Sequence, residues 1–355
     1  MTISHYVRVF APLCVFALVG AGCLDGGTPQ GSALDGGVFR TKDVAVTWQQ
    51  LTALTIGGKV GSIGDVGTVT MAFDPQDAQA VYMGSAENGL FVSLDGGDSW
   101  AVSKGLSSGK VQAVSVDPKD KCTVYVAKAN QVLKTANCGR DWNQVFFDER
   151  VDKIFTAVVV DWFNSNIVYA GTNAGDILRS DDAGGSWRVL TRIEGTNIND
   201  MDIDARDSRV MYVATNGRGI AKTMDSGATW TQIIDPFDAY DGANRPTQIV
   251  LDPGAQNTLY TVSRFGILKS DDSGASWRAL SLPNPPNTVQ IKSMAVHPTN
   301  PRMVVYATDT SIVFTNDGGT TWTSKKLPTK RGVSFIAFDR STPPVLFLGA
   351  YPRKK

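Results

Sequence analysis

The chain has 355 residues and balances 34 Lys and Arg against 34 Asp and Glu, so no net charge attracts nucleic acid or an anionic membrane over a distance. Its two His, at positions 5 and 297, and the absence of any CxxC exclude a multi-histidine or paired-cysteine metal site, and no cofactor motif occurs. Thirty-five Gly, 16 Pro and 8 Trp with 42% hydrophobic residues are typical of an all-β protein with many short strands.

The first 22 residues predict a signal peptide. Arg8 precedes an apolar run, and small residues then lead to Cys23, a pattern too short to span a bilayer comfortably. The segment resembles a bacterial lipoprotein leader, although Gly20 stands where that pattern favours an aliphatic residue. We expect Cys23 to be lipidated, with plain secretion as the alternative.

Residues 23–35 are rich in Gly, Ser, Thr and Pro and show no apolar period, so they predict a flexible tether behind the lipid anchor. Leu24 rather than Asp follows Cys23, which favours the outer membrane in a Gram-negative host. The chain is therefore expected to be exported and anchored in the cell envelope, with the side of the membrane left open.

An exported chain meets an oxidising compartment, where disulfides persist. Apart from the anchor candidate, Cys122 and Cys138 are the only cysteines of the mature chain, and they flank a predicted hairpin. A bridge between them would contribute about 3 kcal/mol for a loop this short, and two reduced thiols are the alternative.

One octamer recurs seven times along the chain. Its copies are TKDVAVTW, SLDGGDSW, TANCGRDW, SDDAGGSW, TMDSGATW, SDDSGASW and TNDGGTTW, ending at Trp48, Trp100, Trp142, Trp187, Trp230, Trp277 and Trp322. Successive Trp residues are 52, 42, 45, 43, 47 and 45 positions apart. This regular spacing indicates one repeated structural unit.

Each complete unit also contains three apolar runs before the octamer and one after it. The first run ends at Asp74, Asp117, Asp161, Asp204, Asp252, His297 or Asp339, and in the six complete cases the Trp follows 25 or 26 residues later. Four short strands in a unit of about 40–45 residues are typical of a β-propeller blade. His297 takes the place of a turn Asp, so we expect it in a surface turn.

The two ends of the chain complement each other. After Asp339 the sequence supplies only two strands, and before Trp48 it supplies only strands three and four. We therefore predict an all-β, seven-bladed propeller over residues 36–355, made of four-stranded blades with its ring closed by both termini, so that no edge strand stays open at the seam.

The octamers resemble the Asp-box of the bacterial neuraminidase repeat (BNR) superfamily, which includes sialidases, xyloglucan-cleaving glucanases, sortilin and the photosystem II assembly propeller; the likeness to the last is one of architecture. In such proteins the boxes form strand three to strand four turns. The Asp and the Ser or Thr can pair the hydrogen-bonding groups of one tight turn, and the Gly supplies the backbone conformation that the turn needs. We therefore expect the box carboxylates to be structural, and ligands to bind on the opposite side, here called the loop face; the side with the boxes is called the box face.

The loop face is built from the strand four to strand one loops, the longest being residues 51–67, 233–247 and 281–290, and from the strand two to strand three turns. Arg and aromatic side chains tend to anchor partners, and solvated loop residues are the alternative. The candidate binding residues are Arg218, Phe237, Tyr240, Arg245, Arg264 and Phe265.

Two functions compete. The first is a non-catalytic envelope lipoprotein whose loop face binds a protein partner in a scaffold or assembly role. The second is a secreted propeller that binds or hydrolyses glycans, which would use paired carboxylates or a Tyr nucleophile. Arg40 in VFRTKD lacks the following Ile-Pro of the sialidase motif, and no spacing pairs the loop acids Glu87, Asp152, Glu194 and Asp241. Binding is therefore preferred over catalysis.

Overall fold

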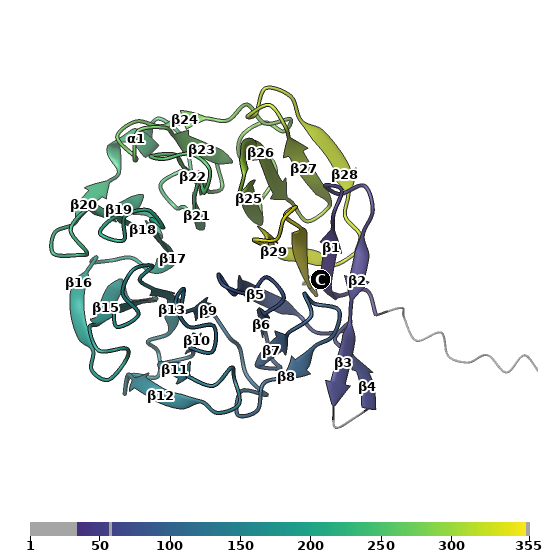
Figure 1. Ribbon diagram of the computed structural model, residues 1–355. Helices are drawn as coiled ribbons and strands as arrows, with labels where there is room; N and C mark the ends of the chain where they lie inside the picture. The colour runs from purple at the N-terminus through teal and green to yellow at the C-terminus, as the bar shows by residue number, and fades with distance from the viewer. Residues whose placement is uncertain (1–33, 57–58, 353–355) are drawn as a thin grey trace, which may run out of the picture. The chain divides into compact units, whose positions relative to one another are not determined.

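The computed structural model describes residues 34–56 and 59–352, which form the predicted seven-bladed propeller with almost no helix (Figure 1). The predicted signal peptide, Cys23 and residues 24–33 of the tether lie outside the described residues. Within the described ranges, no helix combines the length and the apolar character that crossing a bilayer would need.

Each blade is numbered here by its Asp-box, and blades 2 to 7 use consecutive strands. Blade 2 holds β5 (Thr68–Phe73), β6 (Val81–Ser85), β7 (Leu90–Ser93) and β8 (Ala101–Val102). Blade 3 holds β9 (Ala113–Val116), β10 (Val124–Lys128), β11 (Gln131–Thr135) and β12 (Asn143–Phe147). Blade 4 holds β13 (Phe155–Val160), β14 (Val168–Thr172), β15 (Asp176–Ser180) and β16 (Arg188–Arg192). Blade 5 holds β17 (Ile198–Ile203), β18 (Met211–Thr215), β19 (Ile220–Thr223) and β20 (Thr231–Ile233). Blade 6 holds β21 (Gln248–Leu251), β22 (Leu259–Val262), β23 (Ile267–Ser270) and β24 (Arg278–Ala279). Blade 7 holds β25 (Ser293–His297), β26 (Asn300–Ala307), β27 (Ser311–Thr315) and β28 (Thr323–Lys326).

Blade 1 joins both ends of the chain, as the repeat predicts. Its sheet order is β2-β1-β30-β29, with β1 (Gly37–Thr41) and β2 (Gln49–Leu51) from the N-terminal side and β29 (Gly332–Phe338) and β30 (Leu346–Tyr351) from the C-terminal side. Phe39 of β1 pairs with Leu348 of β30 in an antiparallel register. Backbone ladder hydrogen bonds therefore close the ring at this blade.

The hydrophobic core is divided among the seams between blades. Seven clusters of buried apolar side chains each draw residues from two adjacent blades, because every blade presents apolar side chains on both faces of its sheet. The ring thus gains its stability from seven similar interfaces rather than from one central core.

The Asp-boxes are self-satisfied turns. In the fourth box the Ser180 hydroxyl donates to Asp182 (2.8 Å) and accepts from the Gly184 N–H (2.8 Å). Asp182 also accepts from the N–H (2.7 Å) and the hydroxyl (2.7 Å) of Ser186. Hydrogen bonds from Ser186, then from Ser180, lower the pKa of Asp182 to about 2. The carboxylate is therefore engaged by its own turn.

The same turns also lock neighbouring blades together. Ala183 of the fourth box adopts a positive φ of 57°, and its carbonyl accepts hydrogen bonds from the Tyr125 hydroxyl (2.9 Å) and the Lys134 ammonium (2.8 Å) of blade 3. The carbonyls of Ser226 and Ser273 accept equivalent pairs from blades 4 and 5. Arg40 has this role in blade 1, since its guanidinium donates to the Gly96 carbonyl (3.0 Å).

Two long loops contain elements that the sequence reading missed. Residues 51–67 form a hairpin of β3 (Ala53–Ile56) and β4 (Lys59–Ser62), which projects beside blades 1 and 2 in Figure 1. The backbone of β3 also bonds to blade 2, since the Trp100 N–H donates to the Ala53 carbonyl (2.8 Å). The loop after β20 contains the single-turn helix α1 (Asp235–Asp238), with Pro236 in its first turn.

Candidate functional site

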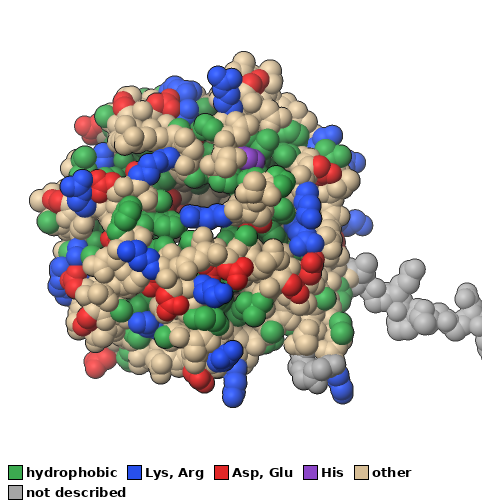
Figure 2. All heavy atoms as spheres, viewed as in Figure 1, with side chains coloured by type: hydrophobic (Ala, Val, Ile, Leu, Met, Phe, Trp, Pro, Cys, Tyr) green, Lys and Arg blue, Asp and Glu red, His purple; other side chains and the backbone are tan. Residues whose placement is uncertain are grey.

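A pocket of about 660 Å³ opens on the loop face over blades 5, 6 and 7. It is called here the arginine pocket, and its lining residues are Asn199, Asn216, Arg245, Thr247, Ser263, Arg264, Asn287, Thr288, Val289, Gln290 and Ile291. Asn199 and Thr247 also line the central channel, so the pocket adjoins the mouth of that channel. Figure 2 shows the ring hollowed at its centre, with basic and acidic side chains around the opening.

Local backbone bonds position the two arginines. Asn244, the residue before Arg245, accepts hydrogen bonds from the N–H groups of Gly217 (3.1 Å) and Gly219 (2.9 Å) in the blade 5 turn. Arg264 lies in the tight turn that Ser263 and Gly266 close with reciprocal backbone bonds of 2.9 and 3.2 Å. Both side chains are exposed, and neither forms an ion pair with a carboxylate of the described residues.

The structure thus brings together two of the six candidate residues, Arg245 and Arg264, in one pocket. Phe265 lines the adjoining pocket rather than this one. Arg218 is exposed on the loop face outside both pockets.

Phe237 and Tyr240 support the surface more than they form it. Phe237 is 1% exposed and packs against Trp277 with ring centroids 5.1 Å apart, so its side chain belongs to the seam between blades 5 and 6. Tyr240 packs against Phe265 at 5.0 Å and donates its hydroxyl to the Trp277 carbonyl (3.3 Å). The expectation of a surface Phe237 is corrected, because the α1 turn directs this ring inward.

A buried ionic cluster between blades 3 and 4 escaped the sequence reading. Lys153 is 4% exposed and forms ion pairs with Asp148 (3.1 Å) and with Asp176. Arg150 binds Asp148 (2.8 Å) and Arg192 binds Asp176. The only sequence signal was an Asp at the start of a strand, in GDILRS, where burial is unusual for an acid.

These two carboxyls are held in the ionised form. A hydrogen bond from Arg150 is the main cause that lowers the pKa of Asp148. Burial alone would raise the pKa of Asp176, but hydrogen bonds from Arg192 and Lys153 lower it. A glycosidase needs a general acid that keeps its proton near neutral pH, so this pair lacks that property.

The central channel carries the opposite kind of carboxyl pair. Asp200 and Asp202 alternate on β17, the innermost strand of blade 5, and therefore point to the same side, toward blade 6. Asp200 accepts the Ile249 N–H (3.0 Å) and Asp202 accepts the Leu251 N–H (3.4 Å), both from the innermost strand of blade 6. Burial raises the pKa of Asp200 to about 6, and burial with the charge of Asp200 raises the pKa of Asp202 to about 7.

Other channel side chains link adjacent blades in the same way. Gln248 exchanges two hydrogen bonds with the backbone of Met294 (2.9 and 3.1 Å), and Ser293 accepts the Ile336 N–H (3.1 Å). The Asp200 and Asp202 contacts thus belong to a ring of side chains that join the innermost strands.

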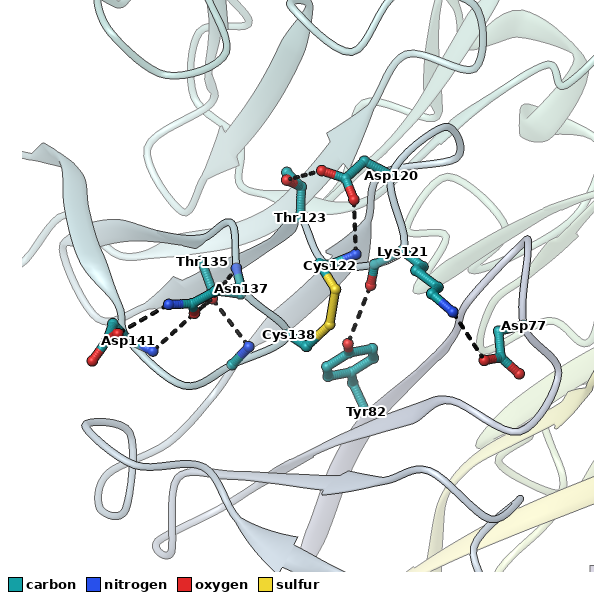
Figure 3. The surroundings of a disulfide bond; sticks show 11 residues. Asp77, Tyr82, Asp120, Lys121, Cys122, Thr123, Thr135, Asn137, Cys138 and Asp141 are labelled. Carbon is teal, nitrogen blue, oxygen red and sulfur yellow. Dashed lines mark hydrogen bonds and ion pairs between the residues drawn. A yellow bond between two sulfur atoms is a disulfide. The ribbon is translucent and has the colours of Figure 1, made fainter.

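Cys122 and Cys138 form the predicted disulfide (Figure 3). Cys138 belongs to the third Asp-box, and its N–H also donates to the Cys122 carbonyl (3.0 Å). The bridge lies on the box face beside Tyr82, whose hydroxyl donates to the Lys121 carbonyl (3.5 Å). It closes the β10–β11 hairpin and lies away from the arginine pocket.

His297 ends β25 in the position of a turn Asp, as expected. Its Nδ1 accepts the Asn300 N–H (3.1 Å), much as Asp252 accepts the Gly254 N–H (2.9 Å) in blade 6. The ring packs against Phe338 at 5.0 Å. Among the described residues, no group of three or more His, Cys, Asp and Glu side chains is placed to hold a metal ion.

Comparison with known proteins shows that the chain is similar to the assembly factor YCF48 and, in fold, to GH74 enzymes. Residues 29–192 match the family model described as photosynthesis system II assembly factor YCF48, so the likeness to that propeller extends to sequence and exceeds the architectural one expected. A sequence search among curated proteins gives no match.

The similar solved structures include GH74 enzymes and YCF48. The GH74 enzyme of Niastella koreensis is 18% identical with a TM-score of 0.65, covering 85% of this chain and 53% of the enzyme. The GH74 xyloglucanase from Xanthomonas campestris is 17% identical with a TM-score of 0.66, covering 86% and 52%. A YCF48 structure bound to D1 peptide is 16% identical with a TM-score of 0.61, covering 81% and 94%. The chain therefore spans about half the length of the GH74 enzymes.

Proposed function

Because the chain is a seven-bladed propeller of BNR-type Asp-box repeats, we propose that it is a non-catalytic scaffold of the bacterial cell envelope whose loop face binds a protein partner. The observation that carries this proposal is the arginine pocket, where two exposed guanidinium groups stand without a carboxylate partner among the described residues. Arg is enriched at the energetic centres of protein interfaces, because its planar group forms several hydrogen bonds at once.

The chemistry of the pocket favours binding over hydrolysis. No Asp or Glu is among the residues that line the arginine pocket, whereas most glycoside hydrolases place two carboxyl groups beside the scissile bond. The YCF48 structure bound to D1 peptide supports the proposal as a propeller of similar fold in complex with a peptide. Glycan binding or hydrolysis is the alternative, which the GH74 likeness in fold favours.

A pull-down from solubilised envelopes of the source organism tests the proposal. The full chain is the bait, beside an Arg245→Ala/Arg264→Ala variant and a matched control, Arg188→Ala/Arg209→Ala, which removes two exposed arginines outside the arginine pocket. We expect one stoichiometric protein to bind the native chain and the control but not the pocket variant. Equal retention by all three baits, or capture of polysaccharide alone, would contradict the proposal.

The envelope location rests on the sequence around Cys23, and we propose that this cysteine carries the lipid anchor. Metabolic labelling with an alkyne fatty acid tests it in cells that express the native chain or Cys23→Ser. The native chain should take up the label and sediment with outer membranes, and the variant should do neither. A labelled Cys23→Ser chain would refute the anchor.

A further inference from the structure

A second, apolar pocket of about 310 Å³ lies in the seam between blades 6 and 7. Its walls include Phe265, Ile267, Leu280, Leu282, Val289 and Tyr306. On the blade 6 side the pocket is lined by Ala279 of the short fourth strand, β24, which has only two residues. Pro283, Pro285 and Pro286 then follow, and proline has no N–H with which to continue the ladder.

Tyr306 is an unusual residue for its position in the blade. It occupies the position in the second strand that the other blades fill with Leu348, Met83, Val126, Ala170, Val213 and Thr261. Tyr306 is 1% exposed, and its hydroxyl has no hydrogen-bond partner among the described residues. Leaving a buried polar group unpaired is unfavourable, so packing alone does not account for a hydroxyl at this wall of the pocket.

The apolar pocket adjoins the arginine pocket. Val289 and Ile291 line both, and the consecutive residues Arg264 and Phe265 line one each. Adjacent Cα atoms are about 3.8 Å apart. Two neighbouring groups of one ligand can therefore reach both pockets at once.

A second hydroxyl, in the turn between the two pockets, is also unpaired. In blades 2 and 5 the last Ser or Thr of the second strand donates to a carbonyl across its turn, Ser85 to Gly89 and Thr215 to Gly219, each at 2.8 Å. The blade 6 turn is one residue shorter, as is that of blade 7, where the Thr308 hydroxyl still donates to the Ser311 carbonyl (3.2 Å). The hydroxyl of Ser263, which is 4% exposed, has no partner among the described residues. Ser263 is one of the residues that line the arginine pocket.

We propose that these pockets form one two-part site for a peptide segment of the protein partner. An aromatic side chain with a polar atom, such as the indole N–H of tryptophan, enters the apolar pocket and hydrogen-bonds to the Tyr306 hydroxyl. A carboxylate on the adjacent residue binds Arg264. This inference rests on the proposed function and specifies the chemistry of the partner. The apolar volume lies at the lower end of ligand pockets, roughly 300–1,000 Å³, and suits one large side chain.

Capped dipeptides test the two contacts separately. The probes are N-acetyl-Trp-Glu-amide, the same dipeptide in reverse order, and two matched analogues in which Phe replaces Trp or Gln replaces Glu. Each is titrated against the full chain and followed by saturation-transfer NMR. We expect saturable binding of a Trp and Glu probe, with both analogues weaker by about 3- to 10-fold, the range for loss of one hydrogen bond or charged contact.

Variants assign each contact to a residue. Tyr306→Phe should weaken the Trp probe about 3- to 10-fold and leave the Phe analogue unchanged, and Arg264→Gln should remove the preference for Glu over Gln. Tyr212→Phe and Arg209→Gln are matched controls outside both pockets and should leave every probe unchanged. No saturable binding of either Trp and Glu probe, or a Trp preference that survives in Tyr306→Phe, would overturn the two-part site.

The outcomes separate this inference from the proposed function. The pull-down can yield a partner whose capture needs Arg245 and Arg264, while Tyr306→Phe leaves the preference for the Trp probe over the Phe analogue unchanged. In that case only the two-part site fails. If the pull-down yields no loop-face partner, the proposed function fails, whatever the dipeptides show.

Discussion

At the residue scale, the box and channel carboxyls of this propeller lie in opposite environments. Box carboxylates such as Asp182 accept hydrogen bonds from their own turns and have lowered pKa values. The channel carboxyls Asp200 and Asp202 are desolvated and have raised values. Their opposite shifts predict opposite dependences of stability on pH.

We predict that Asp202→Asn flattens the pH dependence of stability between pH 5 and 8. The folded state holds the Asp202 proton up to a pKa of about 7, above the usual 3.8. The stability that this proton contributes is therefore fully present below pH 3.8 and is lost progressively as pH rises from there through 7. Asparagine stays neutral and keeps an oxygen for the Leu251 N–H. The variant should be more stable than the native chain at both pH values, and its advantage at pH 8 should exceed that at pH 5 by an amount on the order of 1–3 kcal/mol.

Urea unfolding at pH 5 and at pH 8 measures the free energy of unfolding of the native chain and of Asp202→Asn. Asp182→Asn is the matched control, because its folded pKa is lowered and its ionised form is stabilising, so that variant should lose stability at pH 5 and at pH 8. Arg340 and Asp204 are the other charged groups that act on Asp202, and both remain in the variant. An unchanged slope in Asp202→Asn would contradict the assignment.

Some of the site at this scale was readable in the sequence and some was not. Arg245 and Arg264 were found because turn residues project from a rigid frame. Phe237 was placed wrongly, since an aromatic residue in a loop gives no sign of which way a one-turn helix directs it. The orphan hydroxyls of Ser263 and Tyr306 were invisible as well, because an unpaired group is defined by neighbours distant in sequence.

At the scale of elements, the Asp-box turns link neighbouring blades, and their tryptophans differ in how deeply they are buried. Trp100 is 1% exposed in the seam between blades 1 and 2, whereas Trp187 is only partly buried against Phe146. The first strand of the hairpin β3–β4 adds burial at Trp100: its Ala53 and Thr55 form backbone hydrogen bonds with Trp100, and Leu54 packs in the same buried cluster as the Trp100 ring.

We predict that Trp100→Ala destabilises the propeller more than Trp187→Ala. Truncating a fully buried Trp costs about 3–5 kcal/mol, and a partly exposed ring costs less because water already contacts part of it. Guanidinium unfolding of both variants checks the order, and equal losses would contradict it.

The strands of the blades were predictable because each unit repeats the same alternation, and seven copies confirm one another. The hairpin β3–β4 was read as a loop, since GG and nearby glycines suggested irregular structure, although the alternating TALTI on one side is typical of a strand. Helix α1 is a single turn, too short to leave a helical period in the sequence.

At the scale of the whole molecule, the ring itself was the most predictable feature. The half-blades at the two ends could be matched from the sequence because their strand types are complementary, and the β1–β30 pairing confirms that match. What the ring binds was less predictable, since a rigid scaffold constrains its loops weakly. The central claim is therefore that the loop face, and not the box face, binds a protein.

Site-specific photo-crosslinking in cells of the source organism tests that claim most directly. A benzophenone amino acid is placed at Asn284, an exposed loop-face residue, or at Leu94, which is 68% exposed in the second Asp-box. The loop-face claim predicts a discrete protein adduct from position 284 and none from position 94. An adduct from position 94 alone, or none from either position, would contradict it.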